Sequence, residues 1–209
     1  MGRNLYICVE GLDGSGKDSQ LDMLCQWMTE EGLGLVRVAE PDEQLPTGRL
    51  LRQLLRTGEH PETYAALFLA DRIALQTHKV KPALQAGKSV VSSRSFVSTL
   101  VYQQDNWPLD WLQQLHAYLP AKPDVILYVM TPPDICFQRM SQRDRELEVF
   151  ETPPAMEKAA ERYLWVLQQL PPWLLAPGGQ VVIVDGTGTM EEVHALVKAS
   201  LTPLIKGTE

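Results

Sequence analysis

A glycine-rich segment of the printed sequence has the composition of a phosphate-binding loop. Residues 10–19 read EGLDGSGKDS and contain the pattern G-x-x-x-x-G-K, which ends at Lys17. Glycines let the backbone curve so that several N–H groups converge on one phosphate, and the lysine adds a mobile positive charge. A turn that binds no ligand is the competing interpretation, but this pattern between a strand and a helix is specific. We therefore expect this loop to bind a phosphate-bearing cofactor, with Gly11, Asp13, Gly14, Ser15, Gly16, Lys17, Asp18 and Ser19 as the cofactor-binding residues.

The residue after the lysine departs from the usual loop, in which a serine or threonine hydroxyl at that position reaches Mg²⁺. Asp18 stands there instead, and Ser19 follows it. Because Mg²⁺ prefers hard oxygen ligands and keeps several waters, our hypothesis is that Asp18 anchors the metal, directly or through water, with Ser19 as a second candidate ligand. The alternative is that Asp18 caps the first helix, where an acidic residue suits the helix dipole. The sequence leaves both interpretations open.

Short apolar runs must supply the strands that position this loop. They cover residues 5–9, 35–39, 89–91, 125–130 and 181–184, and segments with helical spacing separate them. Thr189 and Glu192 have the spacing of a capping box at the start of the last helix. We expect its buried face to carry Met190, Val193, Leu196, Val197, Leu201 and Leu204. Apolar strands between helices predict a single α/β domain over residues 1–209, a three-layer, doubly wound, five-stranded parallel sheet.

Composition limits the functional classes. The chain has 209 residues, with 19 Lys and Arg against 26 Asp and Glu, so its net charge is −7. This balance argues against a protein that binds nucleic acid or an anionic membrane through bulk positive charge. No apolar run has the length of a membrane span. The three cysteines have neither a disulfide nor a zinc spacing. We expect free thiols and a cytoplasmic location.

A charged segment interrupts the alternation of strands and helices. Residues 142–148 read QRDRELE, and Thr-Pro-Pro follows at 152–154. A solvated loop is one interpretation. In an α/β enzyme, a loop with clustered arginines between two helices is also where a lid lies. We expect residues 140–154 to form a short arginine-bearing lid within the single domain.

The phosphate loop is the first of several motifs in a fixed order. After EGLDGSGK come Glu40-Pro41, then LFLADR at 67–72, SSRSFVSTLVYQ at 92–103, and a strand from PDV at 123–125 to PPD at 132–134. With this order and spacing, the chain resembles the thymidylate kinase family of P-loop nucleoside monophosphate kinases over nearly its whole length. The resemblance implies a nucleotide kinase fold, transfer of the γ-phosphoryl group of ATP to dTMP with Mg²⁺ for dTTP biosynthesis, and a homodimer.

The resemblance implies roles at the acceptor's base and sugar. Phe68 would stack on the thymine ring, and Arg72, on the same helical face, would hydrogen-bond a base carbonyl. Asp13 would hold the sugar 3′-hydroxyl or a metal-bound water. Tyr102 would crowd the 2′ position, and Gln103 would reach the base. For Phe68 the competing interpretation is an ordinary core aromatic, and for Arg72 it is a surface ion pair with Asp71.

The resemblance also implies a set of phosphate-binding cations. Lys17 would hold the ATP phosphates and Arg94 would grip the acceptor phosphate, while Arg143 and Arg145 would close over the transferred group. These four are the predicted catalytic residues. Arg139 would pack on adenine, with a helix-surface role as the alternative. The predicted substrate-binding residues are Asp13, Glu40, Pro41, Phe68, Arg72, Arg94, Tyr102 and Gln103.

One motif departs from the family pattern. Where the family has Asp-Arg-Tyr, this chain has Ser93-Arg94-Ser95. Two alternatives therefore stay open: a kinase of the same fold that acts on another deoxynucleotide or a modified base, and a catalytically impaired nucleotide-binding homologue. Retention of Lys17, Arg94 and the lid arginines favours a kinase, because binding alone needs no lid.

Overall fold

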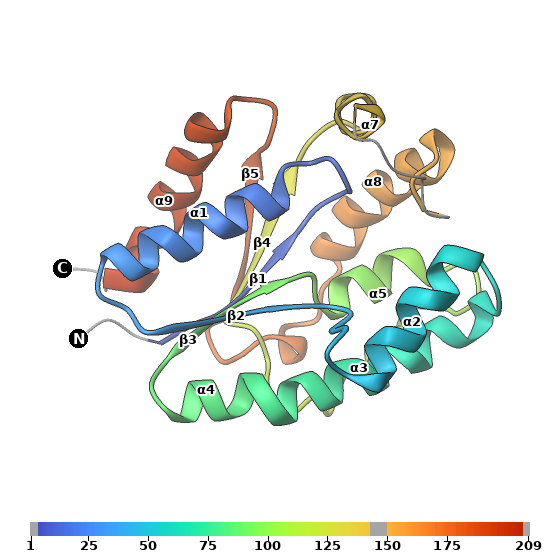
Figure 1. Ribbon diagram of the computed structural model, residues 1–209, viewed down its shortest axis with the longest axis horizontal. Helices are drawn as coiled ribbons and strands as arrows, with labels where there is room; N and C mark the ends of the chain where they lie inside the picture. The colour runs from blue at the N-terminus through green and yellow to red at the C-terminus, as the bar shows by residue number, and fades with distance from the viewer. Residues whose placement is uncertain (1–3, 143–149, 207–209) are drawn as a thin grey trace.

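Five parallel strands form one sheet at the centre of the molecule. The structure is a computed structural model and describes residues 4–142 and 150–206. The strand order is β2-β3-β1-β4-β5, and helices lie against both faces of the sheet (Figure 1). The three-layer α/β fold predicted from the sequence is therefore confirmed. The strands are β1 (Tyr6–Glu10), β2 (Leu35–Ala39), β3 (Ser89–Ser93), β4 (Val125–Met130) and β5 (Gln180–Asp185).

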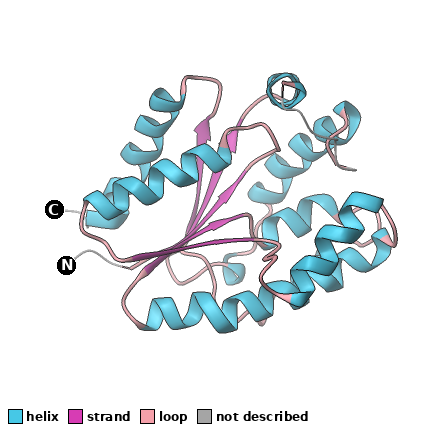
Figure 2. Cartoon of the chain, viewed as in Figure 1, coloured by secondary structure: helices cyan, strands magenta, loops and turns pink. Residues whose placement is uncertain are grey.

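The helices divide between the two faces (Figure 2). On one face lie α1 (Lys17–Glu30) and α9 (Met190–Lys206). On the other lie α3 (Tyr64–Leu75), α4 (Lys81–Gln85), α5 (Phe96–Tyr102) and α8 (Pro153–Gln168). The remaining elements are α2 (Pro46–Thr57), α6 (Leu109–Leu115), α7 (Pro133–Ser141), η1 (Pro61–Thr63), η2 (Gln76–Val80) and η3 (Pro172–Leu174). Within residues 4–142 and 150–206, no helix is long and apolar enough to cross a lipid bilayer.

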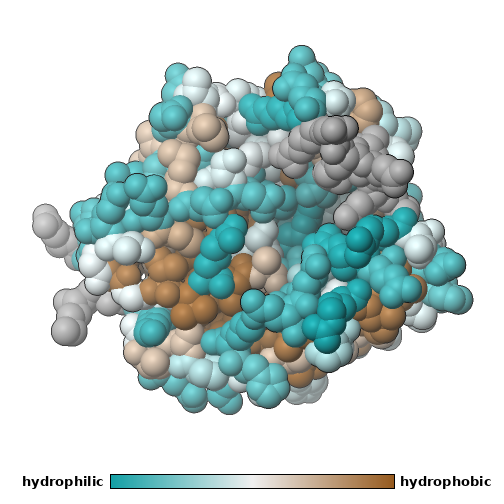
Figure 3. Space-filling view, viewed as in Figure 1, coloured by the Kyte–Doolittle hydropathy of each residue, from teal (hydrophilic) through white to brown (hydrophobic). Residues whose placement is uncertain are grey.

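Burial on both faces explains why the central strands consist of apolar runs. Alternate side chains of a strand point to opposite faces. In β1, Ile7 and Val9 join the apolar cluster under α1 and α9, whereas Tyr6 and Cys8 join the cluster on the other side. The edge strand β2 is less covered, and Figure 3 shows apolar surface beside α1 where this strand lies. All three cysteines are free thiols, as predicted.

At the edge of the sheet where the phosphate loop begins, β1 and β3 extend beyond their predicted ends, as does β5, which continues to Asp185. β1 continues to Glu10 and β3 continues to Ser93, whereas the apolar runs ended at Val9 and Val91. These last residues are polar because they approach the site rather than the core. Hydrophobic patterning alone therefore ends the strands too early.

The predicted buried face of α9 is partly wrong. Val193, Val197 and Leu201 are buried, but Met190 and Leu196 are 56% and 46% exposed. A stripe with a spacing of four residues is enough to cover the sheet beside α1, and Leu196 lies about 100° around the helix from Val197. Met190 occupies the first helical position, at the rim of the sheet.

The capping box at the start of α9 is confirmed. The backbone N–H of Thr189 donates to Glu192 Oε2 at 2.9 Å, and the N–H of Glu192 donates to Thr189 Oγ1 at 3.2 Å. Thr189→Ala removes the acceptor for one of these N–H groups, and we expect it to lower the free energy of unfolding by about 1 kcal/mol. Urea denaturation measures this change. Thr202→Ala, in the same helix, is the matched control, and an equal loss in both variants would contradict the assignment.

Candidate active site

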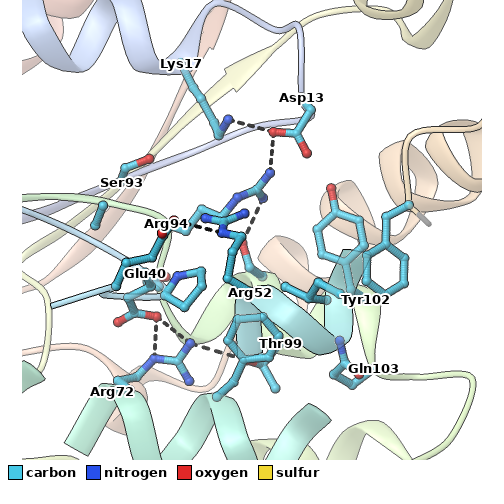
Figure 4. Close-up of a pocket in the computed structure, with 18 of the residues that line it drawn as sticks. Asp13, Lys17, Glu40, Arg52, Arg72, Ser93, Arg94, Thr99, Tyr102 and Gln103 are labelled. Atoms are coloured by element: carbon cyan, nitrogen blue, oxygen red, sulfur yellow. Dashed lines mark hydrogen bonds and ion pairs between the residues drawn. The ribbon is translucent and has the colours of Figure 1, made fainter. Parts of the chain in front are cut away.

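A cavity of about 560 Å³ opens beyond the carboxyl ends of β1, β2 and β3. Ligands of open α/β sheets bind at this edge. The phosphate loop, the segment after β2, α2, α3 and α5 all contribute to its lining (Figure 4). The cavity brings together these residues singled out from the sequence: Asp13, Lys17, Asp18, Glu40, Pro41, Phe68, Arg72, Arg94, Tyr102 and Gln103.

The phosphate loop runs from β1 into α1 as expected, and two of its glycines are needed for geometry. Gly14 has φ 84°, and a Cβ there would lie 2.3 Å from the carbonyl oxygen of Cys136. Gly16 has φ 92° and precedes the first residue of α1. Side chains are strained or excluded at both positions. Beyond the loop, the Thr131 hydroxyl donates to the Ser15 carbonyl at 3.0 Å and fixes the loop against the end of β4.

Asp13 holds two cations side by side at the top of the cavity. Its Oδ1 lies 3.0 Å from Lys17 Nζ and 2.6 Å from Arg94 Nη2. Burial alone would raise the pKa of the Asp13 carboxyl, but the charges of Arg94 and Lys17 outweigh burial and hold the pKa well below its ordinary value. Phosphoryl transfer requires neutralised charge on phosphoryl oxygens, and this pair of cations suits that task.

Arg94 reaches this position from a strained backbone. Its φ is 68°, an uncommon conformation for a residue other than glycine. Its N–H donates to Val9 O at 2.9 Å, which ties the turn to β1. Nη1 donates to Ser98 Oγ at 3.2 Å, and the guanidinium lies 5.6 Å from the centre of the Tyr102 ring. These contacts aim the guanidinium at the phosphate loop, consistent with strain stored at a functional site.

Glu10 is a buried carboxylate that sequence reasoning treated only as the first letter of the loop motif. It accepts hydrogen bonds from the hydroxyls of Ser95 at 2.7 Å, Ser98 at 2.8 Å and Tyr163 at 2.9 Å. Ser95 also caps α5 by accepting from Val97 N at 3.2 Å. The signal for Glu10 was a charged residue at the end of a buried strand. The departure at Ser95 thus serves a local network under the cavity.

Arg72 is fixed at the base of the cavity. Its side chain is 1% exposed, and Nε donates to Glu40 Oε2 at 2.8 Å while Nη2 donates to the same oxygen. Nη2 also donates to Thr99 Oγ1 at 3.3 Å. The surface ion pair with Asp71 is wrong, because Asp71 is itself buried and accepts from the Asp42 N–H at 2.9 Å. Glu40 therefore lines the cavity and also fixes the position of Arg72 there.

His116 completes this network, and no sequence signal pointed to it. It is fully buried, with Nδ1 2.7 Å from the Leu112 carbonyl and Nε2 2.7 Å from Arg72 Nη1. A carbonyl only accepts, so Nδ1 carries the proton, and Nε2 accepts from Arg72. Burial and then the charge of Arg72 lower the pKa of His116 to about 3. The ring is therefore a neutral acceptor that orients the arginine.

This neutral histidine predicts a pH dependence. The unfolded chain binds a proton at His116 below pH 6.5, whereas the folded chain does so only near pH 3. Stability contributed by this site is therefore present above pH 6.5 and declines as the pH falls, by about 1.4 kcal/mol per unit. Lowering the pH from 7.5 to 5 should reduce the free energy of unfolding of both proteins. We expect this reduction to be about 2 kcal/mol smaller in His116→Gln than in the parent.

Urea denaturation at the two pH values measures this difference. His78→Gln, at an exposed position, is the control and should follow the parent. If His116→Gln also follows the parent, the histidine is not held neutral.

Asp18 and Ser93 lie together beside the phosphate loop. Asp18 Oδ2 is 3.0 Å from Lys17 Nζ, and Oδ1 accepts from Ser93 Oγ at 2.9 Å. Gly16, not Asp18, occupies the N-cap of α1, so Asp18 acts on the helix only through its charge in the first turn. Ser19 is half-buried one residue further along. A carboxylate and a hydroxyl are hard oxygen donors of the kind that Mg²⁺ prefers, so this pair fits the metal that the loop implies.

The other predicted residues fall outside the cavity or outside the described chain. Arg143 and Arg145 lie outside the described residues. From the end of the predicted lid, Phe150 lines the cavity and packs 5.2 Å from the Tyr102 ring. Arg139 donates to the carbonyls of Gly186 at 3.3 Å and Ser15 at 3.4 Å, behind the loop. The lining residues that sequence reasoning missed include Arg52, Ser98 and Thr99.

Comparison with known proteins decides the family. A family model described as Thymidylate kinase matches residues 9–197. The chain belongs to the thymidylate kinase family. It is 31% identical to the probable thymidylate kinase of Thermococcus onnurineus, over 91% of this chain and 93% of that protein. It is 30% identical to that of Thermococcus kodakarensis, over 96% and 98%, and to the thymidylate kinase of Fervidobacterium nodosum, over 91% and 94%.

Membership of the thymidylate kinase family makes the chain a nucleoside monophosphate kinase, a transferase that uses ATP. The cavity described above contains the two halves that such a kinase needs. Lys17 and Arg94 lie in its upper part, where both pair with Asp13, and Arg72 lies in its lower part (Figure 4); Phe68, one helical turn before Arg72 on α3, also lines the cavity.

Proposed function

We propose that this chain transfers the γ-phosphoryl group of ATP to dTMP, giving dTDP. One observation carries the proposal. A single cavity joins a region where Asp13 holds Lys17 and Arg94 side by side to a region lined by Phe68 and Arg72. A nucleoside monophosphate has the matching shape, with its phosphate at one end and its base at the other.

The chemistry of the lower end supports a pyrimidine with carbonyl groups. Phe68 is half-buried on α3 and offers a face for stacking. Arg72 donates to Glu40, His116 and Thr99. An arginine has five N–H donors, and these contacts leave an Nη1 donor for a base carbonyl. Gln103 adds an amide at the same end of the cavity, so the set can recognise thymine.

Transfer itself requires alignment and charge neutralisation more than covalent chemistry. In our proposal the loop N–H groups and Lys17 hold the ATP phosphates, and Arg94 holds the acceptor phosphate. Asp18 would anchor Mg²⁺, which supplies further positive charge at the phosphates when bound. The acceptor phosphate is already ionised, so no general base is required. Closure by Arg143 and Arg145, adenine packing by Arg139, the homodimer, the single domain and the cytoplasmic location stay predictions.

A coupled assay of ADP formation with ATP, Mg²⁺ and each deoxynucleoside monophosphate tests the proposal. We expect turnover with dTMP to exceed turnover with dCMP, dAMP and dGMP. Thermal unfolding with each monophosphate gives an independent measure of binding. A preference for another monophosphate would assign a different acceptor. Stabilisation by dTMP without turnover would indicate the impaired homologue.

A further inference from the structure

We infer that Asp18 and Ser93 form one metal-binding pair in which the carboxylate and the hydroxyl of a P-loop site have exchanged positions. The inference rests on the proposed function for the identity of the metal as the Mg²⁺ of a nucleotide complex. It extends that function by adding Ser93 and by explaining the departures at Asp18 and Ser93 as one change.

The usual arrangement of P-loop enzymes gives the first step. A hydroxyl directly after the loop lysine and an acidic residue on a neighbouring strand together hold Mg²⁺. In this chain the residue after Lys17 is acidic, and the hydroxyl belongs to Ser93, the last residue of β3. β3 pairs directly with β1, the strand that leads into the loop, and Ser93 is in register with Val9. Both donor types are present, each at the other's place.

Direct contact gives the second step. Ser93 Oγ donates to Asp18 Oδ1 at 2.9 Å, although 75 residues separate the two positions in the sequence. Both side chains line the cavity beside Lys17 (Figure 4 labels Ser93 and Lys17). Two donors that touch each other can contact one cation, or one cation and its bound water. The carboxylate and the hydroxyl are therefore close enough to share one cation.

Charge gives the third step. Asp18 Oδ2 lies 3.0 Å from Lys17 Nζ, while Oδ1 accepts a hydrogen bond from the Ser93 hydroxyl. Lys17 is shared with Asp13 at the same distance of 3.0 Å. An ionised carboxylate beside the phosphates of ATP is repelled unless a cation lies between them. Mg²⁺ bound by one or two protein oxygens and by phosphates meets that requirement.

The exchange can be tested by reversing it. The variants are Asp18→Ser, Ser93→Asp and the double variant Asp18→Ser/Ser93→Asp, with Asp22→Ser as the matched control. Asp22 lies on the same helix, and its carboxylate pairs with Arg37 on the surface. The readout is the affinity for Mn²⁺, measured by electron paramagnetic resonance in the presence of a nonhydrolysable ATP analogue. It requires neither dTMP nor turnover.

We expect Asp18→Ser to weaken Mn²⁺ binding by about 10–100-fold, and the double variant to recover affinity to within a few-fold of the parent. Binding of the analogue without metal should change little, and Asp22→Ser should match the parent. Unchanged Mn²⁺ affinity in Asp18→Ser would overturn the inference, as would a double variant no better than Asp18→Ser. Asp18→Asn, which keeps the shape of the side chain, replaces Asp18→Ser if thermal unfolding shows that the serine variant does not fold.

Failure of the exchange and failure of the proposed function give different results. If the parent phosphorylates dTMP but Asp18→Ser binds Mn²⁺ normally, the exchange is wrong and the kinase assignment stands. If the exchange variants behave as expected but the parent does not phosphorylate dTMP, the metal pair stands and the acceptor is different.

Discussion

Arg94→Met is expected to lower kcat/KM for dTMP by about 10³-fold or more, the range in which arginines act on transferred phosphoryl groups. The side chain lies 2.6 Å from Asp13 and is held by a backbone turn that points it at the phosphate loop. Methionine keeps much of the length and apolar volume but removes the charge. Because Arg94 is proposed to hold the acceptor, the loss should appear with dTMP varied, while KM for ATP changes little.

Steady-state kinetics with each substrate varied in turn measure the effect. Arg162→Met is the matched control, since Arg162 of α8 does not line the cavity and pairs with Asp105 at 2.6 Å. We expect this control to retain the parent kcat/KM. Arg94→Lys keeps a charge but not the forked donors, so its activity should lie between those of Arg94→Met and the parent. A loss below tenfold in Arg94→Met would remove Arg94 from the catalytic set.

The second large effect concerns the buried pair of Arg72 and Glu40. Arg72→Leu leaves the Glu40 carboxylate buried with no opposite charge, and breaking such a pair costs about 3–5 kcal/mol. Burial raises the pKa of Glu40 to about 7, although the Arg72 charge opposes this. The other carboxylate oxygen, Oε1, has no hydrogen-bond partner among the described residues. Removal of Arg72 raises the pKa further, so the folded variant keeps a proton that the unfolded chain releases.

The raised pKa of Glu40 determines how the cost of Arg72→Leu depends on pH. A carboxyl with a raised folded pKa contributes stability below its unfolded pKa of 4.5, and this is lost as the pH rises through the folded value. The cost of Arg72→Leu should therefore be larger at pH 8 than at pH 5.5, as urea denaturation at both values would show. Arg72→Leu/Glu40→Gln removes the titrating group, so its own free energy of unfolding should change less between the two pH values than that of Arg72→Leu. An equal cost for the single variant at both would contradict the pairing.

The comparison of sequence and structure shows which features a linear pattern can encode. The phosphate loop and the capping box of α9 depend on residues a few positions apart, and both were predictable. Strands buried on both faces are visible as apolar runs, as in β4, where both ends were predicted correctly. The polar ends of β1 and β3 were missed because they serve the site and not the core.

The networks between distant residues were not predictable. His116 approaches Arg72 across 44 positions, and Ser93 approaches Asp18 across 75. No local pattern records such contacts, because they arise only when the sheet and α3, α5 and α6 pack. Glu10 lies between these cases. A charged residue next to four buried side chains of β1 signals a special environment, but its three hydroxyl partners come from α5, its N-cap and α8.

The pairing of β1 with β3 fixes the separation between the segments proposed to hold the donor and the acceptor. The loop proposed to hold the donor leaves the end of β1, and the turn proposed to hold the acceptor leaves the end of β3, in register at Val9 and Ser93. Neighbouring strands are about 4.8 Å apart, and the Arg94 N–H bond to Val9 extends this coupling one residue beyond the strand. The separation between donor and acceptor is therefore a property of the rigid sheet. A one-residue insertion at either strand end would misalign the two phosphates, whereas loops that leave elsewhere can change length without disturbing that alignment.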